Sequence, residues 1–257
     1  MAHDKPNGGL KDKVAVMNRT GMGMSPVDGE QMLQGARDGV PSTAGSGAGM
    51  TTVREQYIAE RTGIGSMPPP TTLKGAAKAA VALAQNQRPN VFLDRLGERL
   101  AFERTGVRLY DALLSHISVL QDKTLGPTPQ ELRTLREEEH RHFELLRNTI
   151  ETLGADPTVQ TPAADAVSVE TMGILQILTD PRSSRSACLH AILVVELADN
   201  DGWKMLIEMA RGLGHEDIVA RFEQAAREEE QHLQKVRGWY SAQMNADMKE
   251  GRVGVDA

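Results

Sequence analysis

Glutamate and histidine recur in the same arrangement in two parts of the chain. The segments Glu139–His142 and Glu229–His232 both read Glu-x-x-His, lie about ninety residues apart, and each follows a second glutamate. A lone glutamate precedes each segment, Glu103 by 36 residues and Glu196 by 33 residues. The chain therefore resembles a duplicated two-helix unit whose four carboxylates and two imidazoles could converge. Such a donor set suits two transition-metal ions held between four helices.

The spacing inside each segment explains why one helix can offer two ligands to one ion. Residues three apart on a helix share a face, so a carboxylate oxygen and an imidazole nitrogen can point to one place. Carboxylates neutralise and bridge cations, while imidazole is a neutral donor that suits iron or manganese. A lone Glu-x-x-His is weak evidence, because glutamates on long helices are mostly solvated.

The helical register favours one set of metal ligands over its competitor. The six candidates fall on apolar seams, where an unpaired carboxylate costs several kcal/mol. The pair Glu137 and His140 has the same internal spacing as Glu139 and His142. Aligning His142 with His232 also aligns the glutamates of the two segments, so we predict Glu139 and His142 as ligands. The predicted set is Glu103, Glu139, His142, Glu196, Glu229 and His232.

Other polar residues lie close to these positions. Asp199 follows Glu196 by one turn and is either a further carboxylate ligand or, as we favour, an exposed residue. Tyr110 and Trp203 each follow a lone glutamate by seven residues. Both are predicted to fill the core, with a hydrogen bond from Tyr110 to a ligand carboxylate as the alternative.

Four long amphipathic helices are predicted to position these residues. The second begins at the Thr128-Pro129 capping sequence and ends at Gly154, and the fourth follows a Gly212-Leu213-Gly214 turn. The segment from Ala155 to Asp180 contains a shorter predicted helix, Val167 to Leu178. The first, second, third and fourth long helices are predicted over about 90–121, 129–153, 183–211 and 215–248.

The predicted fold class is all-α, a ferritin-like four-helix bundle of two antiparallel helix pairs joined by a long crossover. Residues 1–70 hold 12 of the 24 glycines, 6 of the 12 prolines and 7 of the 12 methionines. We therefore predict a disordered tail or an extended arm there, ordered by packing on a neighbouring subunit. A short leading helix and linker (71–89), the bundle (90–248) and a C-terminal tail (249–257) complete the predicted division.

Composition excludes several classes of site. A single cysteine, Cys188, leaves no intrachain disulfide framework and no Cys-x-x-Cys site. The net charge of −6 and the lack of a basic stripe argue against nucleic-acid binding. Neither a signal peptide nor a run long enough to span a bilayer is seen, so we expect no membrane partner and a cytoplasmic location.

The ligand pattern together with Tyr110, Glu138 and Glu228 resembles the ferritin-like di-metal carboxylate superfamily, closest to its rubrerythrin-type and bacterial ferritin-like members. The resemblance covers about residues 90–245. It implies that Glu139 and Glu229 bridge two metal ions. It also implies that Glu103 and His142 complete one ion's ligands, and that Glu196 and His232 complete the other's.

Members of that superfamily react two ferrous ions with dioxygen or hydrogen peroxide, and some relatives use manganese. The resemblance thus implies two iron ions, or two manganese ions, as cofactors of an oxidoreductase in oxidative-stress defence or iron homeostasis. The chain lacks a cysteine-ligated electron-transfer module, so a complete rubrerythrin peroxidase would need an outside reductant. The long tail and crossover helix are also atypical of a cage-forming storage ferritin.

Two other functions fit the same residues. One is iron binding and storage in an oligomeric shell, which particle mass would distinguish from the homodimer that we favour. The other is a non-catalytic bundle that serves as a scaffold, with the N-terminal tail as the interaction element. Substitution of Glu139 or Glu229 would leave that function intact.

Overall fold

The computed structural model describes residues 26–39, 47–61, 75, 89–119 and 125–251, and within these ranges the chain is helical with no strand. Two compact units, Met1–Thr62 and Gly63–Ala257, divide the chain. The all-α class predicted from the sequence is confirmed for the described residues. None of the helices in this part of the chain is both long enough and apolar enough to cross a bilayer.

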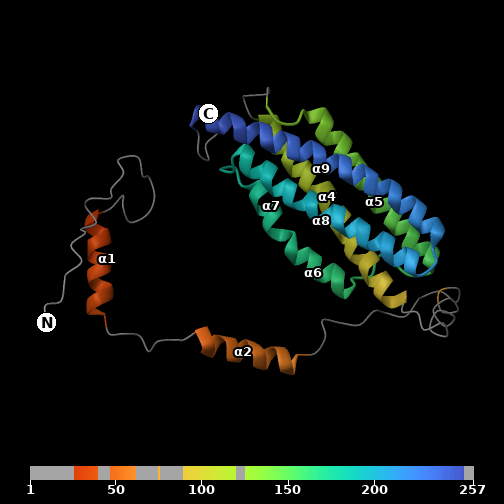
Figure 1. The fold of residues 1–257 in the computed structure, drawn as a ribbon, viewed down its shortest axis with the longest axis horizontal. Helices are drawn as coiled ribbons and strands as arrows, with labels where there is room; N and C mark the ends of the chain where they lie inside the picture. The colour runs from red at the N-terminus through yellow and green to blue at the C-terminus, as the bar shows by residue number, and fades with distance from the viewer. Residues whose placement is uncertain (1–25, 40–46, 62–74, 76–88, 120–124, 252–257) are drawn as a thin grey trace. The chain divides into compact units, whose positions relative to one another are not determined.

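The second unit is built on four long helices (Figure 1), α4 (Pro89–Val119), α5 (Pro129–Leu153), α8 (Arg185–Gly212) and α9 (Glu216–Glu250). Helix α4 packs against α5 and α8 packs against α9, and the two pairs meet chiefly through α4 and α8. These bounds lie within a few residues of the predicted ones. The predicted start of α5 is confirmed, because Thr128 and Glu131 form a capping box and Gly154 adopts a φ of 89° at the end.

The order of the buried residues gives the direction of each helix. One apolar cluster contains Leu96 of α4 and Leu146 of α5, and a second contains Leu113 of α4 and Leu132 of α5. The chain thus runs from the first cluster to the second in α4 and back in α5, so these helices are antiparallel. Helices α8 and α9 show the same reversal, and α8 runs parallel to α5. A long connection between α5 and α8 is therefore required.

That connection carries two helices where one was predicted. Helix α6 spans Pro162–Glu170 and α7 spans Met172–Thr179, and both pack on α4. The predicted single helix from Val167 to Leu178 is therefore wrong. Thr161 caps α6 through its side chain and Pro162 opens it, the same Thr-Pro start that marks α5. A turn at Thr171 separates α6 from α7.

The first unit also differs from the sequence prediction. Helices α1 (Pro26–Asp38) and α2 (Gly47–Glu60) occupy part of the segment that we expected to be irregular. All described side chains of α2 are exposed, and the amide of Gln56 donates to Glu60 one turn later. A helix satisfies its own backbone, so a composition too polar for a core can still form one. The predicted leading helix, Thr72 to Asn86, lies outside the described residues apart from position 75.

Candidate metal centre

The six predicted ligands form a buried layer between the two apolar clusters. Helices α4 and α8 contribute one glutamate each, while α5 and α9 contribute one glutamate and one histidine each. None of the six side chains exceeds 3% exposure. The polar layer interrupts the apolar seam of every long helix at the same level. The residues are Glu103 on α4, Glu139 and His142 on α5, Glu196 on α8, and Glu229 and His232 on α9.

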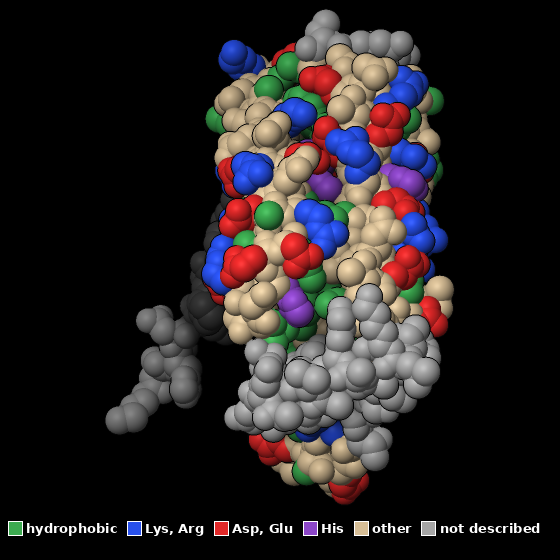
Figure 2. Space-filling view, turned by 90° about the vertical axis from the view of Figure 1, so that its right-hand side faces the viewer, with side chains coloured by type: hydrophobic (Ala, Val, Ile, Leu, Met, Phe, Trp, Pro, Cys, Tyr) green, Lys and Arg blue, Asp and Glu red, His purple; other side chains and the backbone are tan. Residues whose placement is uncertain are grey.

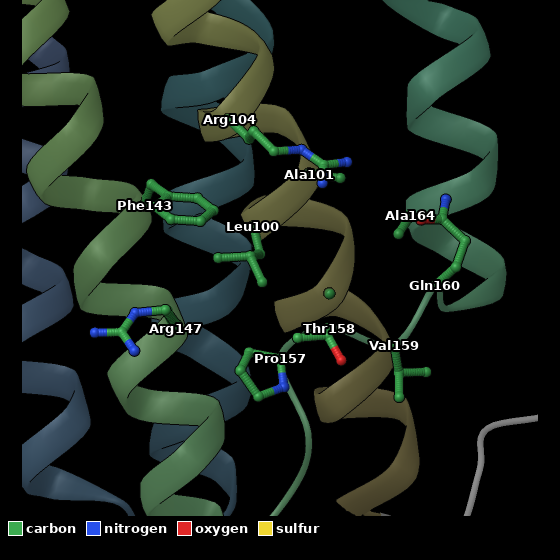
Figure 3. Close-up of a pocket in the computed structure, with 11 residues that line it drawn as sticks. Leu100, Ala101, Arg104, Phe143, Arg147, Pro157, Thr158, Val159, Gln160 and Ala164 are labelled. Atoms are coloured by element: carbon green, nitrogen blue, oxygen red, sulfur yellow. The ribbon is translucent and has the colours of Figure 1, made fainter.

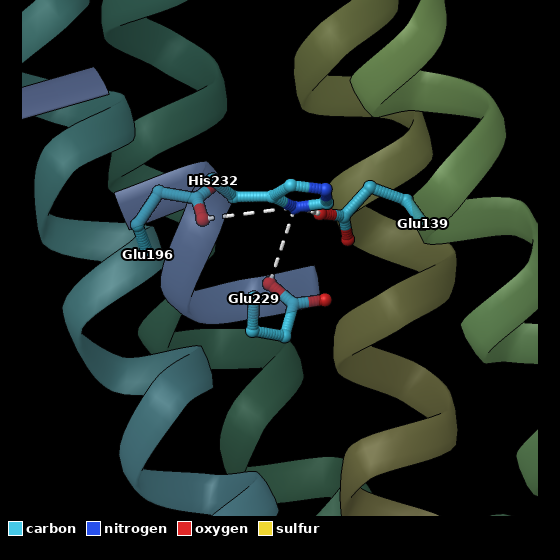
Figure 4. Close-up of side chains that lie close together, drawn as sticks. All are labelled: Glu139, Glu196, Glu229 and His232. Atoms are coloured by element: carbon cyan, nitrogen blue, oxygen red, sulfur yellow. Dashed lines mark ion pairs between the residues drawn. The ribbon is translucent and has the colours of Figure 1, made fainter. Parts of the chain in front are cut away.

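One group of donors surrounds the inner nitrogen of His232. Its Nδ1 lies 3.3 Å from Glu139 Oε1, 3.3 Å from Glu229 Oε2 and 3.9 Å from Glu196 Oε2 (Figure 4). These four residues come from α5, α8 and α9 and point toward one another. Their ligand atoms lie within 4.8 Å of one another, a spacing that one metal ion could span.

A second group surrounds the inner nitrogen of His142. Its Nδ1 lies 2.5 Å from Glu229 Oε1 and 3.8 Å from Glu103 Oε2. Glu229 thus faces both histidines, one with each carboxylate oxygen. A third set of ligand atoms within 4.8 Å of one another contains Glu103, Glu139, Glu229 and Asp199. The groups overlap and therefore describe one extended site.

Carboxylates from the opposite hairpin hold the outer nitrogens of both histidines. His142 Nε2 lies 3.0 Å from Glu228 Oε2, and His232 Nε2 lies 2.8 Å from Glu138 Oε2. Arg141 bridges these two glutamates, at 3.4 Å and 3.6 Å. An imidazole that donates its Nε2 proton outward presents the Nδ1 lone pair inward, the state a metal ligand needs.

Two aromatic residues, each seven positions after a lone glutamate, bind the lone glutamate of the other helix pair. The Tyr110 hydroxyl on α4 donates to Glu196 Oε1 on α8 at 2.5 Å. The Trp203 indole on α8 donates to Glu103 Oε1 on α4 at 2.9 Å. The hydrogen-bonding alternative for Tyr110 is therefore confirmed. The corresponding bond of Trp203 was missed, although the repeated spacing of seven residues was the signal for it.

Several inward-facing atoms of this layer lie near one another, as His142 Nδ1 and Glu229 Oε1 do at 2.5 Å, but are not aligned for a hydrogen bond with any residue that the structure describes. They include one oxygen each of Glu103, Glu139 and Glu196, both oxygens of Glu229, and the Nδ1 atoms of both histidines. Buried polar atoms without partners are rare and costly in native proteins. Carboxylate oxygens and imidazole nitrogens that converge in this way are the donor set of a metal site, so these residues could hold metal ions.

Burial and crowding disturb the ionisation of the same residues. Burial, followed by the neighbouring carboxylates, raises the pKa of Glu103 and Glu196 well above the ordinary glutamate range. Burial opposes ionisation of Glu229, yet the two nearby imidazoles lower its pKa to about 2. Burial likewise opposes protonation of His142, but Glu229 raises its pKa to about 9. Without metal, protons therefore take part in neutralising the cluster.

The structure separates the predicted ligands from their competitors. Glu139 and His142 are buried, whereas Glu137 and His140 are exposed, so the predicted helix face is confirmed. That these residues bind metal stays a prediction. The favoured interpretation of Asp199 is wrong, because its side chain is 1% exposed and ion-paired with Arg99. Two further histidines on the long helices belong to no donor group: His116 on α4 is half-buried and His190 on α8 is exposed.

A surface cavity opens beside this layer, between α4, α5 and the segment that leads into α6 (Figure 3). Leu100 and Phe143 form part of its wall, and each is close in sequence to a predicted ligand, Glu103 or His142. Its volume is about 240 Å³. Arg104 and Arg147 contribute positive charge at its edge.

Metal-free protein is predicted to lose stability as the pH rises from 6.5 to 9. The folded state retains protons on the carboxyl groups of Glu103 and Glu196, whose pKa values are raised, and on His142, whose pKa rises from 6.5 to about 9. The unfolded chain releases these protons earlier, so the free energy of unfolding falls across this interval. Thermal unfolding of chelator-treated protein at the two pH values measures the effect. His142→Gln should reduce the change of the unfolding midpoint with pH, whereas substitution of the exposed His140 by Gln should leave that change as in the wild type. A wild-type midpoint at pH 9 that equals or exceeds the midpoint at pH 6.5 would contradict the raised pKa of His142.

Comparison with known proteins gives one match. No curated protein and no solved structure matches the chain significantly. Residues 88–249 match a protein family described as a domain of unknown function, DUF892. The matched segment contains every residue of the buried layer and the four long helices except the last residue of α9. With more than half of its length matched, the chain belongs to the DUF892 family.

Proposed function

We propose that the second unit is a ferritin-like bundle that binds two iron or two manganese ions and reacts them with dioxygen or hydrogen peroxide. One observation carries the proposal: buried carboxylate oxygens and imidazole nitrogens from all four long helices face one another without hydrogen-bond partners among the described residues. The antiparallel pairs and the long α5–α8 connection agree with that class of bundle.

In this proposal Glu139 and Glu229 bridge the two ions. Glu103 and His142 complete one position, and Glu196 and His232 complete the other. The overlapping donor groups support this division, because Glu229 belongs to both histidine groups and Glu139 lies near both lone glutamates. Four carboxylates carry four negative charges, which two divalent ions balance.

The kind of donor narrows the choice of metal. Mixed carboxylate and imidazole donors suit iron and manganese, whereas thiolate donors would favour zinc or copper(I). The single cysteine, Cys188, lies in an apolar cluster and in none of the donor groups. Two adjacent redox-active ions would supply the electrons that cleavage of an O–O bond requires.

The protein residues have their own tasks in such a reaction. Tyr110 and Trp203 fix one oxygen of each lone glutamate and leave the other free to bind. Glu138 and Glu228 hold the outer protons of the histidines. The two apolar clusters exclude water on both sides of the polar layer. The cavity beside Leu100 and Phe143 offers the oxidant a short approach to the layer.

Iron storage in a larger oligomer would use the same centre, and particle mass distinguishes a shell from the dimer that we propose. The electron donor for repeated turnover would be a separate molecule, because the described residues hold no cysteine-ligated module.

Glu139→Gln is expected to lower the metal content of the protein. The amide keeps the shape of the side chain but removes the charge that two ions share. Metal analysis after anaerobic loading with ferrous iron should give close to two ions per chain for the wild type and fewer than one for the variant. Glu137→Gln is the matched control on the exposed face of the same helix and should behave as wild type. A wild-type content well below one ion per chain would rule out the proposal.

Tyr110→Phe tests the positioning of a ligand carboxylate. Loss of the hydroxyl leaves Glu196 Oε1 without its donor, which should slow the reaction of iron-loaded protein with dioxygen or peroxide by roughly 10- to 100-fold. Stopped-flow absorbance on mixing follows the reaction. Tyr240→Phe, on α9 and outside the donor groups, serves as the control. Equal rates for all three proteins would remove Tyr110 from the site, and no absorbance change in the wild type would refute oxidant chemistry.

A further inference from the structure

A buried ion pair adjoins only one side of the candidate centre. Arg99 Nη1 on α4 lies 2.6 Å from Asp199 Oδ1 on α8, and both side chains are buried. Asp199 shares a donor group with Glu103, Glu139 and Glu229. Among the described residues, Asp199 shares a donor group with the lone glutamate Glu103 and with neither the other lone glutamate, Glu196, nor a histidine. The fifth carboxylate therefore lies on the side of Glu103.

The fold makes specific room for this pair. A Cβ atom at position 202 would overlap the guanidinium of Arg99, so Gly202 on α8 provides the space that Arg99 occupies. The guanidinium carbon lies 4.3 Å from the centre of the Phe102 ring, which covers it on one side. A buried ion pair is often no more stabilising than apolar side chains of similar volume. Stability alone therefore does not account for the arrangement.

The internal repeat shows that the pair breaks the symmetry of the centre. Aligning Glu103 with Glu196 also aligns Tyr110 with Trp203. In this register the positions that form the ion pair differ between the halves, because Arg99 aligns with Ile192, Asp199 with Gly106, and Gly202 with Leu109. Arg99 and Asp199 therefore each correspond, in the alignment of the two halves, to an uncharged residue.

Gly106 explains why the other half has no equivalent carboxylate. A Cβ atom there would overlap Oε2 of Glu139, so this position must stay empty for Glu139 to reach the centre. At the aligned position on α8 the chain carries Asp199 instead. In the first half, the space beside Gly106 is occupied by Glu139. In the second half, the aligned position carries a carboxylate of its own, Asp199.

We propose that Asp199 is a further donor for the metal position of Glu103 and His142, with Arg99 as its counter-ion, so that the two positions bind metal unequally. The inference rests on the proposed function, since it assumes a pair of metal ions. The pair adds no net charge, so four glutamates still balance two divalent ions. The extra carboxylate nevertheless favours a cation at the position beside Glu103, because Arg99 holds Asp199 through one oxygen, Oδ1.

Opposite effects of two substitutions distinguish this role from a structural one. Asp199→Asn removes the donor charge and leaves Arg99 as an unpaired cation, so it should weaken the tighter position. Arg99→Met removes the cation and leaves Asp199 free, so it should strengthen the same position. The double variant removes both charges and leaves matching ligand sets, so it should make the positions nearly equal. A pair that served only packing would give weaker binding in both single variants.

Cobalt(II) titration of the metal-free full-length chain, followed by calorimetry and visible absorbance, measures the two binding steps. We expect two resolved steps in the wild type. Asp199→Asn should weaken the tighter step about tenfold or more, and Arg99→Met should tighten it by a similar factor. The steps should merge in the double variant. Asp111→Asn, which alters a surface partner of Arg136, is the control and should change neither step.

The outcomes separate the inference from the function on which it rests. Wild-type protein that binds less than one cobalt ion would contradict the proposed function itself. Two equal steps in the wild type, or weakening of both steps alike in the single variants, would overturn the inference and leave a di-metal centre standing. If the Arg99→Met variant does not fold without metal, the cobalt titration of the double variant still tests the inference, because the double variant carries no unpaired buried charge. Unequal steps in that double variant would also overturn the inference.

Discussion

The structure depends on a layer of ionisable side chains placed where water cannot reach them. Glu103, Glu139, Glu196 and Glu229 are each at most 1% exposed, and they belong to overlapping groups whose ligand atoms lie within 4.8 Å of one another. A buried carboxylate without a counter-charge costs several kcal/mol, so four of them require cations or protons. Protons held by the cluster would supply part of that charge in the absence of metal, and two divalent ions would supply all of it.

The way in which this layer is held ties the two hairpins together. Tyr110 of the first hairpin bonds Glu196 of the second, and Trp203 of the second bonds Glu103 of the first. The histidines are held crosswise in the same manner, by Glu228 and Glu138. Neither hairpin can complete its own ligands without the other. Metal binding and association of the hairpins are therefore expected to stabilise each other, as in other proteins whose sites form only on folding.

Helical periodicity was sufficient to predict the faces of the long helices. Leu135, Glu139, His142 and Leu146 repeat in steps of three and four, and the structure buries all of them while it exposes His140. Helix ends with explicit signals, such as Thr128 with Glu131, were predicted for the same reason. These features depend on residues close together in the chain, which a single sequence displays.

Contacts between distant residues that lie outside the repeated pattern were not predicted. The partner of Asp199 is Arg99, 100 positions away, and no local pattern shows whether an acid beside a seam will meet a cation. A glycine inside a long helix was the available signal, because Gly202 leaves the space that Arg99 fills. The break between α6 and α7 was also missed. Helices α1 and α2 were also not predicted. Composition argued against a buried core in that segment, but it does not exclude helices, whose hydrogen bonds are local.

Membership of the DUF892 family identifies the domain, and the buried layer supplies a chemical interpretation of it. The most direct measurement is anomalous X-ray diffraction from crystals grown with manganese, recorded on both sides of the manganese absorption edge. The account predicts two anomalous peaks between α4, α5, α8 and α9, both in contact with Glu139 and Glu229, with one nearer His142 and the other nearer His232. An ordered cluster of these side chains with no anomalous peak at saturating manganese, and none when iron replaces it, would contradict the account.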